Sequence, residues 1–558
     1  MKNLYIKLLP LLSAIILFTS CNKDYLVKEP IDLPSVSSFL KSEDELELAI
    51  NGAYAKLWYS LEYNLPVEVH LDLASDIGYS RALTDFQFMG NGTVDASNPI
   101  IVGLWKNYYA GIQRANYILD NVGNIKEIKN QARVDQIVSE AKFLRAYFYY
   151  HLTEMFGDVP LVTKELTLEE SYMNKTPKSE ITDFILNDLE AAAQVLPLKY
   201  TKAEEIGRAT KGIALALKSR IALFNNKWDV SSDAAKRVID LSVYELEPDY
   251  ASLYLKEKQL VSKEIMFMLH YKSGVQTHLG PKWVAPRMSS GFAGLIPTQS
   301  MIDSYLCLDG LTIDKSPDYD PAHPFDNRDP RLNYSCIVPG SIFNGYQYET
   351  HKDSVRCWNY NVTPAVRVTN QDATNAFASF SGYCWRKYSD IRDPSYLSLS
   401  ETGIILMRYA EVLLNYAEAK IEANNIDQSV YDAINKLRDR VDMPLVTGGK
   451  SQEELRSIIR IERKSELAFE GLRLYDIRRW GIAENVLNGP LYGRIPRGLL
   501  SSAPVVDENG TPNYSNVSNR SEMRVIEQRV FDKNKNYLWP IPQFETDINS
   551  NLKQNNGY

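Results

Sequence analysis

Three glutamates in the C-terminal part of the chain could do acid–base chemistry. Glu462, Glu466 and Glu470 are spaced four residues apart in 459-IRIERKSELAFEGLRLYDIRRWG-481. This spacing places them on one face of a helix, and two neighbouring carboxylates are what a glycosidase uses. Several arginines crowd the same segment, among them Arg463, Arg473, Arg478 and Arg479. Ion pairs at helical spacing explain these three glutamates, which we call the glutamate row, more simply. We therefore predict a structural ion network and no catalytic residue.

No other segment has the spacing of a known catalytic or cofactor motif. The 6 histidines form no His-Glu-x-x-His pair, and neither a Gly-x-Ser-x-Gly turn nor a phosphate-binding glycine loop is present. We therefore predict no zinc site and no cofactor. The run 318-DYDPAHPFDNRD-329 is rich in oxygen ligands but lacks the Gly and final Glu of an EF-hand, which leaves a calcium site open.

Five cysteines raise two separate questions. Cys307, Cys336, Cys357 and Cys384 could form disulfides in an exported protein, and their spacing does not decide how many. Cys21 is different, because it follows Lys2, Lys7 and the apolar run 8–19. That run is shorter than the roughly 20 residues of a membrane span, which indicates a signal peptide over 1–20.

The residues around Cys21 favour lipidation. Phe18-Thr19-Ser20-Cys21 resembles a bacterial lipobox, in which small residues precede the cysteine that becomes the acylated first residue of the mature protein. An ordinary cleaved signal followed by a chance cysteine is the alternative. We predict that Cys21 carries the lipid anchor and that the rest of the chain is globular.

Composition limits the class of protein. The chain has 558 residues, of which 44% are hydrophobic and 24% charged, and its formal net charge is −8. No stretch concentrates Lys and Arg, so nucleic acid is not an expected partner. The 35 tyrosines outnumber the 18 Phe and 8 Trp. Tyrosine suits sugar-like or peptide-like ligands, but it suits helix packing equally well.

Apolar periodicity predicts a mostly α-helical fold. Spacings of three and four predict helices over 105–122, 137–152, 179–196, 214–224 and 231–241. Helices return over 404–441, where Arg408 to Val441 spans the 34-residue period of a tetratricopeptide pair. Between these regions, residues 246–403 are rich in Gly, Pro, Asn and Asp, which predicts loops with a few short strands such as Ile265–Leu269 and a helix over 298–306.

Five segments together resemble the SusD/RagB family of outer-membrane nutrient-binding lipoproteins. They are residues 143–162, 207–224, 408–422, 462–481 and 537–558. The resemblance implies tetratricopeptide-like helix pairs as a scaffold and a SusC-like TonB-dependent transporter as partner. It divides the mature chain into a helical region over 21–245, a loop-rich region over 246–403 and a second helical region over 404–558. It also implies lipid attachment to the outer membrane, facing the exterior.

The same resemblance places the ligand face on two loops, 76–92 and 276–292. Flat aromatic rings stack on sugars and polar neighbours bond their hydroxyls, so the expected ligand-binding residues are Tyr79, Arg81, Trp283 and Phe292. Gly280-Pro281 and Pro286 are turn residues that would hold the indole of Trp283 outward. The alternative is that Trp283 and Phe292 only anchor a long loop.

Glycan binding is therefore the expected function, with delivery to the transporter. A peptide-binding role like that of RagB is the alternative within the binding class. A surface glycosidase is the alternative from the enzyme class, and the formation of new reducing ends on a glycan would distinguish it. The sequence does not name the sugar.

Overall fold

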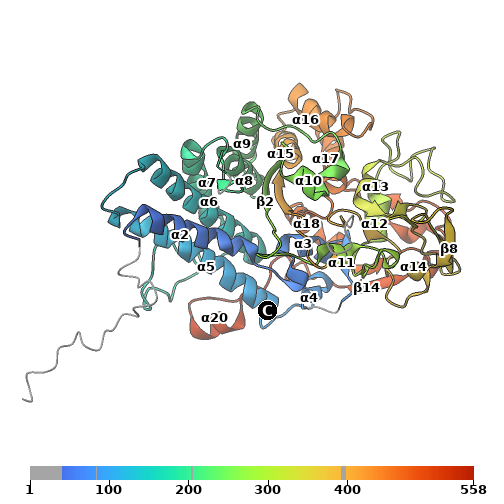
Figure 1. Ribbon diagram of the computed structural model, residues 1–558, viewed down its shortest axis with the longest axis horizontal. Helices are drawn as coiled ribbons and strands as arrows, with labels where there is room; N and C mark the ends of the chain where they lie inside the picture. The colour runs from blue at the N-terminus through green and yellow to red at the C-terminus, as the bar shows by residue number, and fades with distance from the viewer. Residues whose placement is uncertain (1–39, 83–84, 203–204, 391–396) are drawn as a thin grey trace, which may run out of the picture.

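The computed structural model describes residues 40–82, 85–202, 205–390 and 397–558. Cys21 and the signal peptide predicted over 1–20 lie outside these residues. Long helices occupy one side of the molecule, and short strands, short helices and loops occupy the other (Figure 1). The fold is mostly α, with a loop-rich region inserted between two groups of helices, as the sequence predicts.

Consecutive helices pack against each other to form the scaffold. The bounds are α2 Glu43–Tyr54, α5 Pro99–Asn121, α6 Gln131–Phe156, α7 Lys178–Val195, α8 Lys211–Phe224, α9 Trp228–Asp240, α15 Tyr409–Glu422, α16 Gln428–Asp439, α17 Gln452–Glu466 and α18 Arg473–Arg479. Helices α5 to α9 pack in chain order, and α15 continues the stack against α9 before it packs on α16 and α17. The predicted helices are confirmed.

Local signals fix the ends of these helices. Asn98 caps the start of α5 by accepting the N–H groups of Ile100 and Ile101, and Pro99 occupies the first turn. Gly157 ends α6 with a φ of 73°, a left-handed value that favours glycine.

Two predicted helix boundaries are wrong. Residues Ile404–Arg408 form strand β10, not the start of a helix, and pair antiparallel with β2, Ile265–Leu269. All five residues of β10 are buried, so this apolar run lacks the polar face of a surface helix. The helix predicted over 459–481 is also interrupted, because α17 ends at Glu466 and the chain turns at Phe469 and Gly471, both with positive φ.

The loop-rich region contains small antiparallel sheets. Strand β1, Gly78–Ser80, pairs with β3, Leu295–Pro297, and β4, Cys336–Ile337, pairs with β9, Cys384–Trp385. A four-stranded sheet has the order β5-β6-β7-β8, and two further pairs are β11 with β14 and β12 with β13. The bounds of these strands are β5 Ile342–Phe343, β6 Tyr346–Gln347, β7 Arg356–Asn359, β8 Val366–Thr369, β11 Gly489–Tyr492, β12 Val505–Val506, β13 Pro512–Asn513 and β14 Val525–Arg529.

Short helices complete the region and the N- and C-terminal segments. They are α3 Val67–Leu71, α4 Gln87–Asn91, α10 Lys256–Gln259, α11 Gly280–Val284, α12 Gln299–Ser304, α13 Arg331–Ser335, α14 Gln371–Thr374, α19 Ala483–Val486 and α20 Gln543–Ile548. The helix predicted over 298–306 corresponds to α12.

The four cysteines of the described residues form no disulfide. Cys307, Cys336, Cys357 and Cys384 are all free thiols, and all four are buried.

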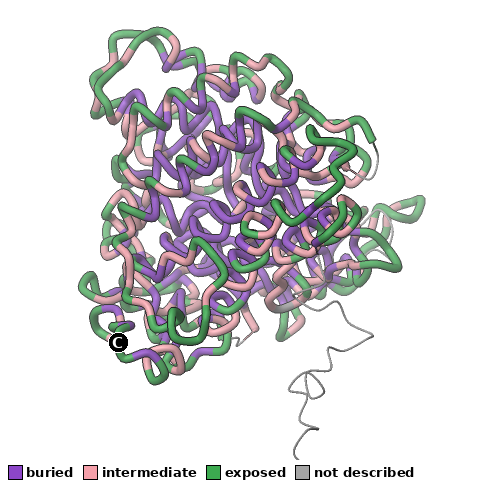
Figure 2. The backbone as a smooth tube through the Cα atoms, turned by 90° about the vertical axis from the view of Figure 1, so that its left-hand side faces the viewer, coloured by how far each residue is buried: buried purple, intermediate pink, exposed green. Residues whose placement is uncertain are grey.

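One large hydrophobic core joins both groups of helices to the loop-rich region. It runs from Leu40 to Leu552 in the sequence and includes Trp385 and Trp539, which are among the largest fully buried side chains. Figure 2 shows the buried backbone in the interior and exposed segments around it. Among the described helices, none combines the length and apolar character needed to cross a membrane.

Candidate functional site

The two loops predicted to bind ligand lie next to each other. Pairing of β1 with β3 sets Tyr79 opposite Ile296. Just beyond the strand, the Arg81 N–H donates to the Gly294 carbonyl at 2.7 Å, and Arg81 Nη2 donates to the Phe292 carbonyl at 2.9 Å. Hydrogen bonds to the backbone therefore bring Arg81 beside Phe292, although the two residues are 211 positions apart.

Trp283 lies in the middle of this arrangement. It stands on the one-turn helix α11, and its ring stacks on Tyr63 with a centroid distance of 3.7 Å and an interplanar angle of 28°. Phe292 meets it edge-on at 5.1 Å. The expectation of an indole held outward on a loop is wrong, because the ring is half-buried against the main core.

Gly294 makes the position of Trp283 possible. A Cβ atom at residue 294 would lie 2.5 Å from Cε3 of Trp283, closer than carbon atoms can approach. The indole N–H of Trp283 is buried and has no hydrogen-bond acceptor among the described residues. Trp283 therefore both anchors its segment and contributes a ring to the surface.

Two aromatic residues that the sequence did not single out extend this surface. The guanidinium carbon of Arg81 lies 5.2 Å from the ring centre of Phe377 and 5.7 Å from that of Phe380. Phe377 is 63% exposed. We call Tyr63, Trp283, Phe292, Phe377 and Phe380 the aromatic platform. Phe377 and Phe380 come from a separate turn whose only sequence signal is aromatic residues among small polar ones.

Tyr79 supports the platform and is not part of its surface. Its ring is only 7% exposed and packs with Ile296 and Leu491 in a small separate core. Burial raises the pKa of its phenol. Since a ring must present a face to stack on a sugar, this burial argues for a role in holding β1, two residues before Arg81.

Asp372 holds the segment between Trp283 and Phe292. Its buried carboxylate, on α14, accepts the backbone N–H of Arg287 at 2.7 Å and that of Met288 at 3.4 Å. Burial raises the pKa of Asp372 to about 7, although these two N–H groups act in the opposite direction. The carboxylate thus fixes the short turn Arg287–Ser289, which leads directly to Phe292.

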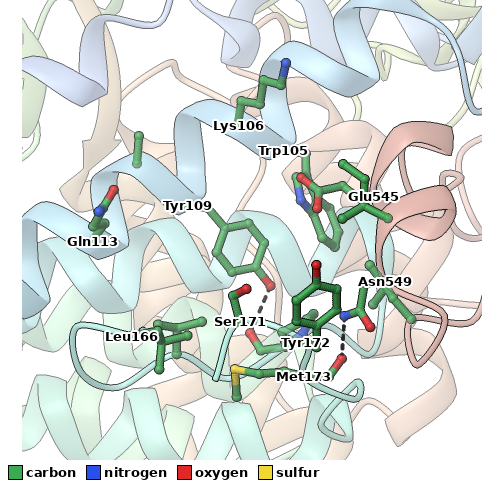
Figure 3. Close-up of a pocket in the computed structure, with 15 residues that line it drawn as sticks. Trp105, Lys106, Tyr109, Gln113, Leu166, Ser171, Tyr172, Met173, Glu545 and Asn549 are labelled. Atoms are coloured by element: carbon green, nitrogen blue, oxygen red, sulfur yellow. Dashed lines mark hydrogen bonds between the residues drawn. The ribbon is translucent and has the colours of Figure 1, made fainter. Parts of the chain in front are cut away.

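A separate cavity of about 390 Å³ lies in the helical half, between α5, α20 and the segment 160–173. Figure 3 shows Trp105, Tyr109 and Tyr172 on its walls. The Tyr109 hydroxyl donates to the Pro160 carbonyl at 2.9 Å, and the Asn549 side chain donates to the Met173 carbonyl at 2.8 Å. None of the four predicted ligand residues lines this cavity, and two of its polar groups already serve to join neighbouring segments.

The predicted ion network around the glutamate row is confirmed, with partners from distant segments. Arg331 bonds Glu462 and Glu466, and Arg408 bonds Glu466 and Glu470. Lys387 also bonds Glu470, at 2.7 Å. Each carboxylate is therefore buried against at least one cation.

Three of the arginines of the same segment have other acids as partners, whereas Arg478 bonds the Asn536 carbonyl at 3.1 Å. Arg463 and Arg479 pair with Glu418 and Asp476, and Arg473 pairs with Asp76. The expectation that these ion pairs follow helical spacing is wrong, since most of them join separate elements. Burial raises the pKa of Glu466, but Arg440, Arg408 and Arg331 outweigh it and leave this pKa well below its usual range.

The acidic run 318–329 uses its oxygens within the turn. The Asp320 carboxylate accepts the Ala322 N–H at 2.8 Å and bonds the His323 ring at 2.8 Å. Within the described ranges, no group of three or more His, Cys, Asp or Glu side chains is arranged to hold a metal ion.

Comparison with known proteins identifies the family. The model of the SusD family matches residues 270–558, and a model described as starch-binding, associating with the outer membrane, matches residues 24–223. The chain is 28% identical to a SusD-like protein of Formosa agariphila, across 98% of both chains. It is 23% identical to the starch-binding protein SusD of Bacteroides thetaiotaomicron, across 80% of this chain and 76% of that one.

A solved structure agrees with these matches. A SusD-like carbohydrate-binding protein from Bacteroides fragilis superposes with a TM-score of 0.78 at 29% identity, covering 92% of this chain and 100% of the other. Since one family model matches more than half of the chain, this protein belongs to the SusD family.

Proposed function

We propose that this protein binds a glycan on the aromatic platform and delivers it to a SusC-like TonB-dependent transporter in the outer membrane. The observation that carries the proposal is the platform itself. Trp283, Phe292 and Phe377 come from separate turns and gather at one surface, with Arg81 among them. Aromatic faces stack on sugar rings, and arginine can bond their hydroxyl groups.

The relatives support a glycan as the ligand. The starch-binding protein SusD and the carbohydrate-binding protein of Bacteroides fragilis are named for such ligands. Transfer to a transporter, attachment through Cys21 and an outward orientation follow from the family resemblance and remain proposals. Binding without cleavage is supported by the glutamate row, whose carboxylates are buried in ion pairs and not free to act on a glycosidic bond.

The experiment is calorimetry of the purified protein against a panel of polysaccharides and a mixture of oligopeptides. We expect a glycan to bind, and we expect Phe377→Ala to weaken binding about tenfold, since stacking of one ring is worth roughly 1–3 kcal/mol by analogy with base stacking. Because Phe377 is 63% exposed, its removal should hardly change the melting temperature.

Tyr172→Ala is the matched control, because Tyr172 is 46% exposed but lines the cavity of the helical half. Its glycan affinity should equal that of the wild type. Binding of peptides and of no glycan would favour the RagB-like alternative. New reducing ends in the glycan incubation would instead show an enzyme.

A further inference from the structure

Four cations converge on the aromatic platform. They are Arg81, Lys282, Arg287 and Arg524. The Nζ atom of Lys282 lies 4.9 Å from the ring centre of Phe292, and the guanidinium carbon of Arg287 lies 5.7 Å from the same centre. The guanidinium carbon of Arg524 lies 4.0 Å from the centre of Phe380, the ring that Arg81 also approaches. All four side chains are half-buried.

None of these four cations forms an ion pair with an acid among the described residues. Two carboxylates of neighbouring segments are already engaged: Asp372 by the backbone N–H groups of Arg287 and Met288, and Glu527 by Arg529 Nε at 2.6 Å. Several buried guanidinium groups elsewhere are paired with acids, as Arg473 is with Asp76 at 2.8 Å, whereas Arg328 bonds only backbone carbonyl groups. Asp372 acts on the charge of Arg287 through space, but no carboxylate of the described residues forms an ion pair with any of the four cations, so the platform keeps positive charge.

The cations also act unfavourably on each other. Burial lowers the pKa of Arg81, and the neighbouring Arg287 lowers it further. Gathering like charges in a half-buried setting raises the free energy of the folded protein, and a bound anion would remove this penalty.

Cation–π contacts account for only part of this arrangement. One cation over one ring is a common stabilising pair. Here Phe292 has two cations over its ring and Phe380 has two, in a protein whose formal net charge is −8. An acidic protein that gathers unpaired cations at one face has a positive local field there, which attracts negative ligands.

We propose that the glycan bound at this platform is a polyanion, carrying carboxylate or sulfate groups. This inference rests on the proposed function and names the class of glycan. The sugar rings lie on the aromatic faces, while the anionic groups bond Arg81, Lys282, Arg287 and Arg524. Guanidinium groups suit this role because their paired N–H donors match the oxygens of a carboxylate or sulfate.

The test compares polysaccharides that share a backbone and differ in charge. Affinity electrophoresis and calorimetry are run with dextran and dextran sulfate, with polygalacturonate as a carboxylated probe and laminarin and amylose as further neutral probes. We expect the charged polymers to bind more tightly than the neutral ones. The preference should weaken as salt rises from about 10 mM to about 150 mM, because the Debye length falls from about 30 Å to about 8 Å.

Two matched variants locate the charge effect. Lys282→Gln removes a lysine from above Phe292, and Lys106→Gln removes one that lies 4.5 Å from the ring centre of Phe544 on the helical half. We expect Lys282→Gln to weaken polyanion binding roughly fivefold at low salt, the effect of losing one contact between unit charges in water. Lys106→Gln should bind as the wild type does. Arg287→Gln serves as a second variant, and thermal unfolding confirms that each variant is folded.

The outcomes separate this inference from the proposed function. Tight binding of a neutral glycan, lost in Phe377→Ala but unchanged in Lys282→Gln and Arg287→Gln, would overturn the polyanion proposal and keep the glycan function. Polyanion binding that Phe377→Ala leaves intact, or that Lys106→Gln weakens equally, would show unspecific ion exchange and also overturn it. Binding of none of these glycans would overturn both.

Discussion

Gly294 is the residue on which the geometry of the platform depends most directly. Residue 294 lies against the indole of Trp283, and the same indole stacks on Tyr63. We expect Gly294→Ala to push the indole off Tyr63, to destabilise the protein by about 1–3 kcal/mol as overpacking does, and to weaken glycan binding. Chemical unfolding and calorimetry measure the two effects.

Gly123→Ala is the control, because a Cβ atom at residue 123 would meet nothing within 4 Å. It should leave both quantities unchanged. A Gly294→Ala protein with wild-type stability and affinity would show that Trp283 can move freely, and that its position does not matter for the ligand.

Individual residues of the platform also show which parts of the site could be predicted from the sequence and which could not. Arg81, Trp283 and Phe292 could be proposed because they lie on loops that the family resemblance connects with ligands. Phe377 and Phe380 could not, since no periodic pattern marks a residue that reaches a surface through tertiary packing. The burial of Tyr79 was equally invisible, because it depends on Leu491 from a strand far along the chain.

At the scale of elements, the glutamate row joins α17 to β10 and to the loop-rich region. Glu470 accepts Arg408 Nε and Lys387 Nζ, both at 2.7 Å, and its side chain is only 5% exposed. We expect Glu470→Gln to destabilise the protein by about 3 kcal/mol or more, since it leaves two buried cations short of their acid. Glycan affinity should not change. Glu422→Gln, which affects a pair that is only partly buried, should cost about 1 kcal/mol or less.

The stability that Glu470 contributes should decrease as the pH falls. Burial raises its pKa, but Arg408 and Lys387 outweigh this effect and lower the pKa to about 2, from an ordinary value of 4.5. A carboxylate with a lowered folded-state pKa stabilises the protein above pH 4.5, and this contribution is lost as pH falls towards 2. Acid unfolding should therefore destabilise the wild type more steeply than Glu470→Gln, and parallel curves would contradict the network.

Asp372 should behave in the opposite way. Its pKa is raised to about 7 from an ordinary 3.8, so the folded protein holds a proton that the unfolded chain releases. The contribution of Asp372 to the free energy of unfolding is complete below about pH 4. It amounts to at most about 4 kcal/mol and is lost as the pH rises to about 7. Urea unfolding at several pH values should show the wild type losing stability relative to Asp372→Asn over this window. A constant difference would show that Asp372 stays ionised.

Some helices and strands could be predicted from the local sequence pattern, whereas others depend on contacts with distant parts of the chain. The helices α5 to α9 could be predicted because apolar residues recur in each of them at spacings of three and four. The apolar run 404–408 fits either a helix or a strand. It forms strand β10 because it pairs with β2, and the paired residues of β2 lie 135 or more positions earlier in the sequence, where local patterns cannot identify them.

At the scale of the whole molecule, most of the helical scaffold lies on one side and α14 on the other, with α20 at the lower left of the view and α14 at the right (Figure 1). A positive face on an acidic protein would draw a polyanion from solution towards the platform. Such steering acts only if the protein is held where the glycan arrives, which makes the anchor at the N-terminus part of the proposed function.

Cys21 lies outside the described residues, and its role is tested in cells. The first described residue is Leu40, so Cys21→Ala should leave the fold and the melting temperature unchanged. Several acyl chains on one cysteine hold a protein firmly at a membrane, whereas a single chain gives only marginal attachment. We therefore expect the wild type to fractionate with outer membranes and Cys21→Ala to be soluble, in cells that lack the partner transporter. Equal membrane recovery of the two proteins would mean that another contact holds this protein at the membrane, and would separate its glycan binding from a lipid anchor.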